Sequence, residues 1–301
     1  MPFGDEPLTL RRLERAVDAA RECGFAALSA NDHFVFQTPW LDGPTALASM
    51  VERSGEMELA TTVSLAALRG PVPLAKTLAA IDVLSKGRLI AGVGPGSSAR
   101  DYAMVGVPFE ERWRRFDEAL GLLRALLRGE PMPERPAFYA VPPDIELMPS
   151  PWRRSGIPLW VGSWGSRAGL ARVARAGDGW LASAYNTTPE RFAAARAALA
   201  DALERHGREA TGFPNGLATM WTWVSKDRAE GDRVLADVLA PILRRGVDEL
   251  RGQVCVGPAG HCAQLLASYA EAACDRVYLW PLGDEARQVE LVAETVLPEL
   301  S

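Results

Sequence analysis

Short apolar segments alternate with amphipathic helical segments along almost the whole chain, and this alternation constrains the fold more than any other feature. It is typical of a parallel β-sheet whose strands are joined by crossover helices. The predicted strands are residues 25–29, 58–63, 89–93, 159–161, 179–182, 219–224 and 276–280. The predicted helices are residues 8–23, 44–54, 73–85, 109–127, 167–176, 189–206, 258–273 and 285–297.

Eight helices and seven strands predict a (β/α)8 TIM barrel whose first strand is truncated, because only Pro2-Phe3-Gly4 precedes the first helix. An open, doubly wound sheet is the alternative topology, although it seldom reaches eight units. Two segments interrupt the alternation: residues 129–156 after the fourth barrel strand, and the charged residues 225–252 after the seventh. We expect both to be insertions, and residues 1–301 to form a single domain.

Composition and charge exclude several classes of protein. The net charge of −5 disfavours general nucleic-acid binding. No apolar run is long enough to cross a membrane, and the first residues lack the basic and apolar regions of a signal peptide. We therefore expect a cytoplasmic protein whose four cysteines are free thiols. No metal site is expected, since Cys255, His261 and Cys262 lack the usual ligand spacing.

Two stretches of the chain, residues 88–98 and 158–166, are built alike. In each, a short apolar run meets a Gly/Ser turn, and a helical segment follows at once. Backbone N–H groups and a serine hydroxyl at such a turn can hold a phosphate at the helix N-terminus. The alternative is that the glycines only relieve crowding between strand and helix. The turn residues are Gly94, Gly96, Ser97 and Ser98 in the first stretch and Gly162, Ser163, Trp164, Gly165 and Ser166 in the second.

Other polar and aromatic side chains stand at the predicted strand ends, where a barrel of this type places its active site. His33 follows a strand and has a carboxylate, Asp32, beside it in the sequence. Trp40 lies in the following loop, and Trp221 and Trp280 lie near other strand ends. Together they predict an aromatic pocket beside the phosphate-binding turns, although core packing explains any single tryptophan equally well.

Several motifs resemble those of the luciferase-like monooxygenase superfamily, whose members use FMN or the deazaflavin F420. The similarity extends over nearly the whole chain. Its most specific parts are Asn31-Asp32-His33-Phe34, Thr61-Thr62-Val63, and residues 89–102, 106–112, 116–118, 160–166, 177–180 and 276–283. The resemblance implies a (β/α)8 barrel with an isoalloxazine-type ring lying across its mouth.

The resemblance also implies roles for particular residues. Thr62 and Val63 would lie against the ring, joined by a non-proline cis peptide. The turns at 94–98 and 162–166 would hold the cofactor phosphate, with Tyr102 and Asp32 also at the cofactor. His33 matches a position that lies near the reactive ring carbon in several F420-dependent members. The turn at Pro95-Gly96-Ser97 lacks the acidic residue of some sugar-oxidising members, which argues against a sugar phosphate substrate.

We therefore expect an oxidoreductase that binds F420 or FMN and transfers a hydride to or from a small organic substrate. The resemblance favours F420 slightly, because Asp32-His33 with Trp40 is similar to that branch. The alternatives are an FMN-dependent monooxygenase that inserts oxygen and a non-catalytic flavin-binding protein. A homo-oligomer is also expected, since a truncated first strand would leave a seam in the barrel.

Overall fold

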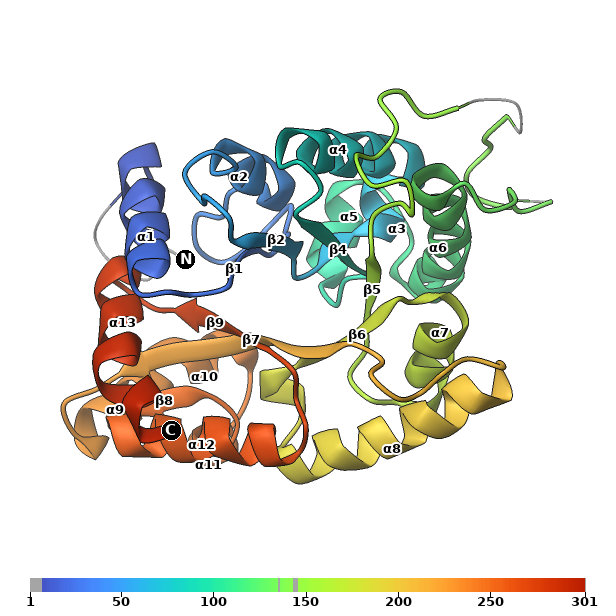
Figure 1. Ribbon diagram of the computed structural model, residues 1–301. Coiled ribbons are helices and arrows are strands. Elements are labelled where there is room, and N and C mark those ends of the chain that lie inside the picture. Colours follow the sequence, from blue (N-terminus) through green and yellow to red (C-terminus); the bar gives the residue numbers. More distant parts are fainter. Residues whose placement is uncertain (1–6, 135, 143–145, 301) are drawn as a thin grey trace.

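The computed structural model describes residues 7–134, 136–142 and 146–300, and shows parallel strands curled into a half-barrel with helices outside them (Figure 1). The strands are β1 (Ala27–Ala30), β2 (Glu58–Thr61), β3 (Ser64–Leu65), β4 (Leu89–Gly94), β5 (Leu159–Gly162), β6 (Gly179–Ser183), β7 (Asn215–Val224), β8 (Cys255–Gly257) and β9 (Val277–Pro281). The predicted barrel-type α/β fold is confirmed.

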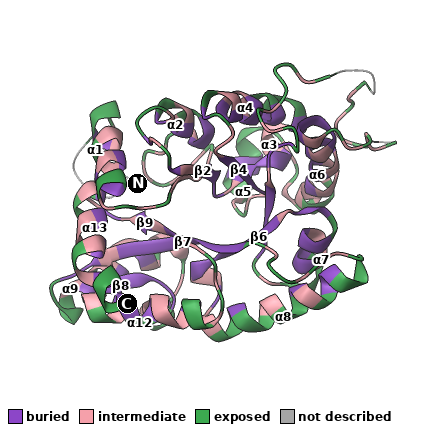
Figure 2. Cartoon of the chain, viewed as in Figure 1, coloured by how far each residue is buried: buried purple, intermediate pink, exposed green. Residues whose placement is uncertain are grey.

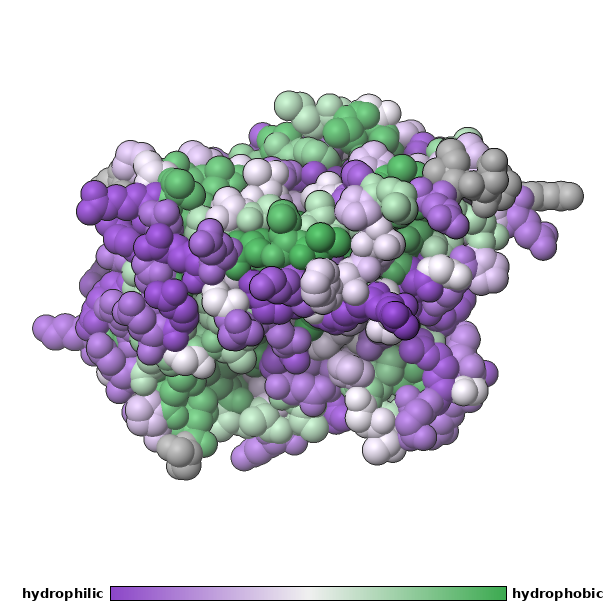
Figure 3. Space-filling view, turned by 45° about the horizontal axis from the view of Figure 1, so that its top comes forward, coloured by the Kyte–Doolittle hydropathy of each residue, from purple (hydrophilic) through white to green (hydrophobic). Residues whose placement is uncertain are grey.

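The described residues form thirteen α-helices, most of which pack outside the sheet (Figure 1). They are α1 (Leu10–Glu22), α2 (Gly43–Ser49), α3 (Ala66–Arg69), α4 (Pro71–Leu84), α5 (Ala99–Met104), α6 (Arg112–Arg128), α7 (Arg167–Ala176), α8 (Pro189–Arg205), α9 (Arg228–Val234), α10 (Ala240–Leu243), α11 (Val247–Arg251), α12 (Ala259–Glu271) and α13 (Glu285–Leu291). Buried residues lie mainly along the strands and the inner faces of these helices, and exposed ones on the outer faces (Figure 2). On the face shown in Figure 3, hydrophilic residues predominate, with smaller hydrophobic areas between them.

The strand order decides between the two topologies considered. Parallel pairing runs through β1, β2, β4, β5, β6 and β7 in chain order, and β9 then pairs with β7. In a doubly wound sheet the order of the strands reverses at a switch point. The strand order found here shows no such reversal. The curl brings one residue from each of six strands into a single inner cluster. These residues are Ala60, Ile90, Trp160, Leu181, Ala218 and Tyr278.

The predicted strands need two corrections, one to a boundary and one to a strand that was missed. The strand predicted at 219–224 begins earlier, at Asn215. Because β7 is this long, one of its edges pairs with β6 near its start and with β8 near its end. The short strand β8 was not predicted at all; it follows the insertion 225–252, which forms α9 to α11. Because β8 has only three residues, it lacks the length that makes an alternating pattern visible.

The predicted first strand, residues 2–4, lies outside the described residues. Among the strands that the structure describes, β1 pairs with β2 alone and β9 with β7 alone. Within the described residues, no strand pairs with both β1 and β9.

Candidate active site

His33 follows β1 at the carboxyl edge of the sheet, which we call the mouth. Its Nδ1 is 2.8 Å from Oδ2 of Asp101, which lies on α5. The Asp101 side chain is 1% exposed, and its Oδ1 accepts hydrogen bonds from the backbone N–H groups of Phe34 and Val35. A carboxylate at Nδ1 orients the imidazole and leaves Nε2 to interact with a bound molecule.

Asp32, the carboxylate next to His33 in the sequence, is engaged elsewhere. Both Asp32 oxygens accept hydrogen bonds from the Arg69 guanidinium at 2.6 Å, and Oδ2 also accepts one from the Leu65 N–H at 3.1 Å. Arg69 contacts Asp42 as well. Although burial opposes it, pairing with these two carboxylates raises the pKa of Arg69. Asp32 therefore anchors the His33 loop to Leu65 and Arg69. The carboxylate that contacts the His33 imidazole is that of Asp101.

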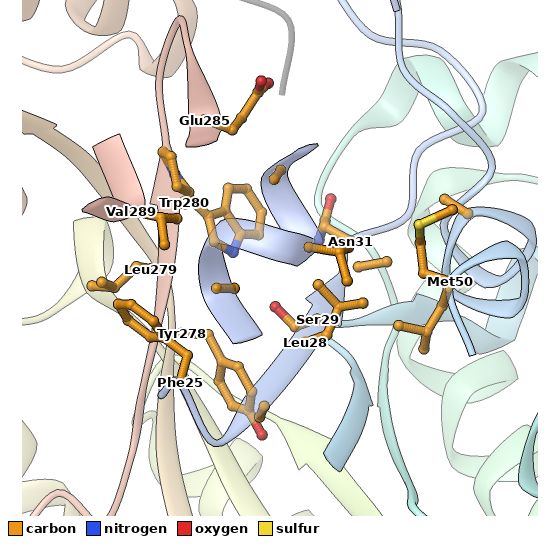
Figure 4. Close-up of a pocket in the computed structure, with 18 of the residues that line it drawn as sticks. Phe25, Leu28, Ser29, Asn31, Met50, Tyr278, Leu279, Trp280, Glu285 and Val289 are labelled. Carbon is orange, nitrogen blue, oxygen red and sulfur yellow. The ribbon is translucent and has the colours of Figure 1, made fainter. Parts of the chain in front are cut away.

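Aromatic rings surround His33 on one side of the mouth. The His33 ring centroid lies 4.9 Å from that of Phe36 and 5.3 Å from that of Trp40. The Trp40 ring is in turn 6.2 Å from Trp280, which lines a cavity shown in Figure 4. Trp221 packs behind Trp280 with ring centroids 5.2 Å apart and is 1% exposed. It supports Trp280 from within the core and is not among the residues that line this cavity.

The peptide bond between Thr62 and Val63 is cis, as the resemblance implied. Val63 lies against the glycines of both turns: a Cβ atom on Gly94 would be 2.7 Å from its side chain, and one on Gly162 would be 3.2 Å away. The Asn31 amide donates a hydrogen bond of 2.9 Å to the Thr62 carbonyl oxygen. The ends of β1, β2, β4 and β5 thus meet around Val63, and larger residues at either glycine would separate them.

Each predicted turn leads into a helix, but the two helices differ in length. Gly96 has φ of 80° and Gly165 has φ of 86°, a backbone region that favours glycine. The Ser98 hydroxyl caps α5, which has six residues, and the Ser166 hydroxyl caps α7, which has ten. Because only α7 has nearly three full turns, it offers the stronger N-terminal dipole.

The other residues predicted to contact the cofactor differ in how deeply they are buried. The Ser163 Oγ accepts a hydrogen bond from Gly165, Ser97 is exposed, and the Trp164 side chain is 57% exposed. Tyr102 is fully buried, and its hydroxyl donates a 2.5 Å hydrogen bond to the Pro95 carbonyl oxygen. Burial raises the pKa of this phenol. Tyr102 therefore braces the first turn from behind.

Sequence reasoning assigned no role to Asp101 or Arg69. Asp101 occupies the first turn of α5, where an acidic residue is usual for helix stability alone. Arg69 ends the four-residue helix α3, which was not predicted separately. No local sequence pattern distinguishes either residue from the charged residues of the surface.

The sequence matches the family described as luciferase-like monooxygenase over residues 3–246. Among curated proteins, it is 35% identical over 114 residues to an uncharacterised protein of Mycobacterium tuberculosis, covering 38% of each chain. It is 30% identical over 174 residues to an F420-dependent glucose-6-phosphate dehydrogenase of Amycolatopsis mediterranei, covering 54% of this chain and 50% of the relative. The alignments thus span about half or less of these relatives.

Solved structures share the fold. An F420-dependent secondary alcohol dehydrogenase superimposes with a TM-score of 0.82 at 16% identity, covering 96% of this chain and 94% of the other. The FMN-bound oxygenating component of the 3,6-diketocamphane monooxygenase of Pseudomonas putida has a TM-score of 0.74 at 14% identity, covering 100% and 96%. At these sequence identities, the comparison shows a shared fold alone.

Within residues 7–134, 136–142 and 146–300, no helix has the length and apolar character needed to cross a membrane. No group of three or more potential metal ligands occurs among the same residues.

Proposed function

Because this chain belongs to the luciferase-like monooxygenase family, we propose that it is an oxidoreductase that binds F420 or FMN at the mouth. It transfers a hydride to or from a small organic substrate. The observation that carries the proposal is the His33–Asp101 pair, held at the mouth beside the ring of Trp40. F420 is slightly favoured, since the matched relatives include F420-dependent dehydrogenases.

The residues at the mouth fit a planar ring with a phosphate tail. Thr62 and Val63 would hold the ring, because the neighbouring glycines leave room for close approach at the meeting strand ends. The turn at residues 162–166 would hold the phosphate at the N-terminus of α7. The shorter α5 makes the turn at 94–98 the weaker of the two candidates.

When bound, such a cofactor would give a hydride to the substrate or accept one from it, and the protein would supply orientation and exclusion of water. Where the hydride goes to the substrate, His33 donates a proton, or a hydrogen bond, from Nε2 to the reacting molecule. Asp101 stabilises the charge that the imidazole gains when it is protonated. The rings of Phe36, Trp40 and Trp280 exclude water from one side.

Oxygen insertion with reduced FMN is the alternative reaction, supported by the shared fold of an FMN-bound monooxygenase. A non-catalytic flavin-binding protein is a further alternative, which would need the turns but not His33. Fluorescence titration of the purified protein with F420 and with FMN separates the cofactors. Oxygen consumption, measured against anaerobic oxidation of the reduced cofactor, separates the reactions.

The role of His33 is tested with His33→Ala. General acid–base help is worth about 10²–10⁴-fold, so we expect turnover to fall by a factor in this range while cofactor affinity stays within a small factor of the original. Unchanged turnover in a folded variant would remove His33 from the mechanism. Binding of neither F420 nor FMN would overturn the proposed function itself.

A further inference from the structure

Two hydrogen bonds join the insertion between β7 and β8 to two loops of the mouth. The Gln37 side-chain amide donates one of 3.4 Å to the Ile242 carbonyl oxygen. The Arg245 Nη2 donates one of 2.9 Å to Oδ1 of Asn186. Gln37 belongs to the loop after β1, and Asn186 to the turn after β6. Residues 242–245, which we call the bridge, thus connect these two loops.

The two loops lie far apart around the curl of the sheet. From β1, parallel pairing passes through β2, β4 and β5 before it reaches β6, which makes four steps between neighbouring strands. Four steps are half of an eight-stranded barrel. A segment that is bonded to both loops therefore passes over the mouth, where the carboxyl ends of the strands meet and where His33 lies.

A chain of hydrogen bonds fixes the Asn186 end of the bridge. The Asn186 Nδ2 donates to Oγ of Ser183 at 2.9 Å, and this Oγ is 2.8 Å from Oγ1 of Thr219. The Thr219 Oγ1 also accepts a 3.0 Å hydrogen bond from the Ala184 N–H. Thr219 has φ of 60°, a conformation that costs free energy in a β-branched residue and is typical of functional sites. The turn after β6 is therefore held in place from β7.

Arg245 keeps hydrogen-bond donors for a ligand after these contacts are made. Its Nη1 donates to Oε1 of Glu249 at 3.0 Å, so the contacts in the described part of the chain occupy two of its five N–H groups. The side chains of Arg245 and Glu249 are 36% and 41% exposed. An exposed ion pair of this kind adds little free energy, so Glu249 competes weakly with a bound carboxylate.

A neutral phenol lies beside the same guanidinium. Burial raises the pKa of Tyr185, although the charge of Arg245 opposes the shift. The phenol is therefore protonated at neutral pH and is able to donate a hydrogen bond. A guanidinium with an O–H donor next to it favours an anionic oxygen ligand, because a guanidinium forms its strongest hydrogen bonds with carboxylates and phosphates.

We propose that Arg245 binds a carboxylate group of the substrate, so that the protein acts on small organic acids. This inference rests on the proposed function, because it names the substrate class of the same mouth. Asn186 is a positioning residue, which holds the guanidinium over the mouth through its Oδ1. The rest of the substrate would lie beneath the bridge, on the side of His33 and the ring of Trp40.

Calorimetric titration with benzoate and with benzamide tests the site, because the two molecules have similar shapes and differ in charge. Both titrations are carried out on the protein alone and on the protein saturated with F420 or FMN. A hydrogen bond to a charged group changes affinity about tenfold or more, so we expect benzoate to bind more tightly by that factor.

Arg245→Met should remove the preference for benzoate, and Arg245→Lys, which keeps the charge, should retain part of it. Arg228→Met is the matched control. Arg228 belongs to the same insertion and also faces an acidic residue four positions further on, Asp232, but it lies at the start of α9, outside the bridge. This control should keep the full preference.

Asn186→Asp distinguishes binding of a substrate from simple fastening of the insertion. The carboxylate keeps a partner for Arg245 and neutralises its charge, so we expect an unchanged melting temperature and a loss of the benzoate preference. If Arg245 served only to fasten the insertion, the benzoate preference would be the same in this variant as in the original protein.

Three results would overturn the inference. They are equal affinities for benzoate and benzamide in the original protein, an undiminished preference in Arg245→Met, and a loss of cofactor affinity in Arg245→Met, which would assign the guanidinium to the cofactor. A benzoate preference that depends on Arg245, found in a protein that binds neither F420 nor FMN, would retain the anion site and overturn the proposed function instead.

Discussion

At the scale of single residues, the structure assigns different tasks to two neighbouring polar side chains. Asp32 anchors its loop through Arg69, and His33 takes its orientation from Asp101. The two functions are separable, because no residue is shared between the two contacts. Mutations of Asp32 and Asp101 should therefore have distinct effects.

Asp101→Asn should lower kcat by less than the about 10²–10⁴-fold loss expected for removing His33 itself. The amide still accepts the backbone hydrogen bonds of the loop but cannot stabilise a charged imidazole. We expect little change in cofactor affinity and a shift in the pH profile of kcat. Asp32→Asn is the comparison: it should lower the melting temperature through the lost Arg69 pairing. Equal pH profiles for Asp101→Asn and the original would contradict the role of Asp101.

Gly92→Ala tests how closely β2 and β4 approach. A Cβ atom at Gly92 would lie 2.0 Å from the Thr61 carbonyl oxygen, so the strands must shift. We expect a loss of about 1–3 kcal/mol in the free energy of unfolding, measured by urea denaturation. Gly246→Ala is the control, since nothing lies within 4 Å of the added carbon. An unchanged free energy of unfolding in Gly92→Ala would show that β2 and β4 can separate without loss of stability.

At the scale of elements, the mouth depends on how helices begin and pair. Serine or threonine caps α5, α7 and α8, and each cap satisfies an N–H group that has no partner within its helix. If α7 also holds a phosphate, its cap contributes to binding as well as to stability.

Ser166→Ala should cost about 1 kcal/mol of stability and also weaken cofactor binding in a titration. Thr188→Ala removes the equivalent cap of α8, a helix to which the proposal assigns no phosphate, and should cost similar stability with no change in affinity. The same affinity in both variants would place the phosphate elsewhere.

The packing of α6 against α7 should depend on pH. Asp117 of α6 contacts Arg172 and Arg175 of α7; although burial opposes it, these pairs lower the pKa of Asp117. A carboxylate with a lowered pKa adds stability above its unfolded value of about 3.9, and that stability is lost as the pH falls through the folded pKa.

We therefore expect the melting temperature to fall below about pH 4 less steeply in Asp117→Asn than in the original protein. Glu52→Gln, at an exposed position, is the control. The same fall of melting temperature with pH in all three proteins would show that the α6–α7 ion pairs add no net stability.

At the scale of the whole molecule, we propose that residues 1–301 act as one domain in the cytoplasm and assemble as a homo-oligomer. The cavity lined by residues of β1 and β9 and the helical insertion after β7 both leave surface that a second subunit could cover. Light scattering at micromolar concentration should give at least twice the monomer mass. A single species of 32.5 kDa would contradict the assembly.

The order of strands and helices could be predicted from the sequence, because an apolar run of five residues or an amphipathic turn is a local property. The glycines at 96 and 165 and the caps Ser98 and Ser166 were visible for the same reason: their backbone conformation and hydrogen bonds involve residues within three positions. The motifs around His33 and Thr62 also indicated the family.

Only the tertiary structure decided which side chains meet. His33 and Asp101 are 68 positions apart, and Asp32 and Arg69 are 37 apart, so their contacts depend on strand register and on where helices pack. The burial of Trp221 behind Trp280 depends on the same register between β7 and β9. The cavity lined by residues of β1 and β9 likewise exists only in three dimensions, because it lies between two strands from opposite ends of the described chain.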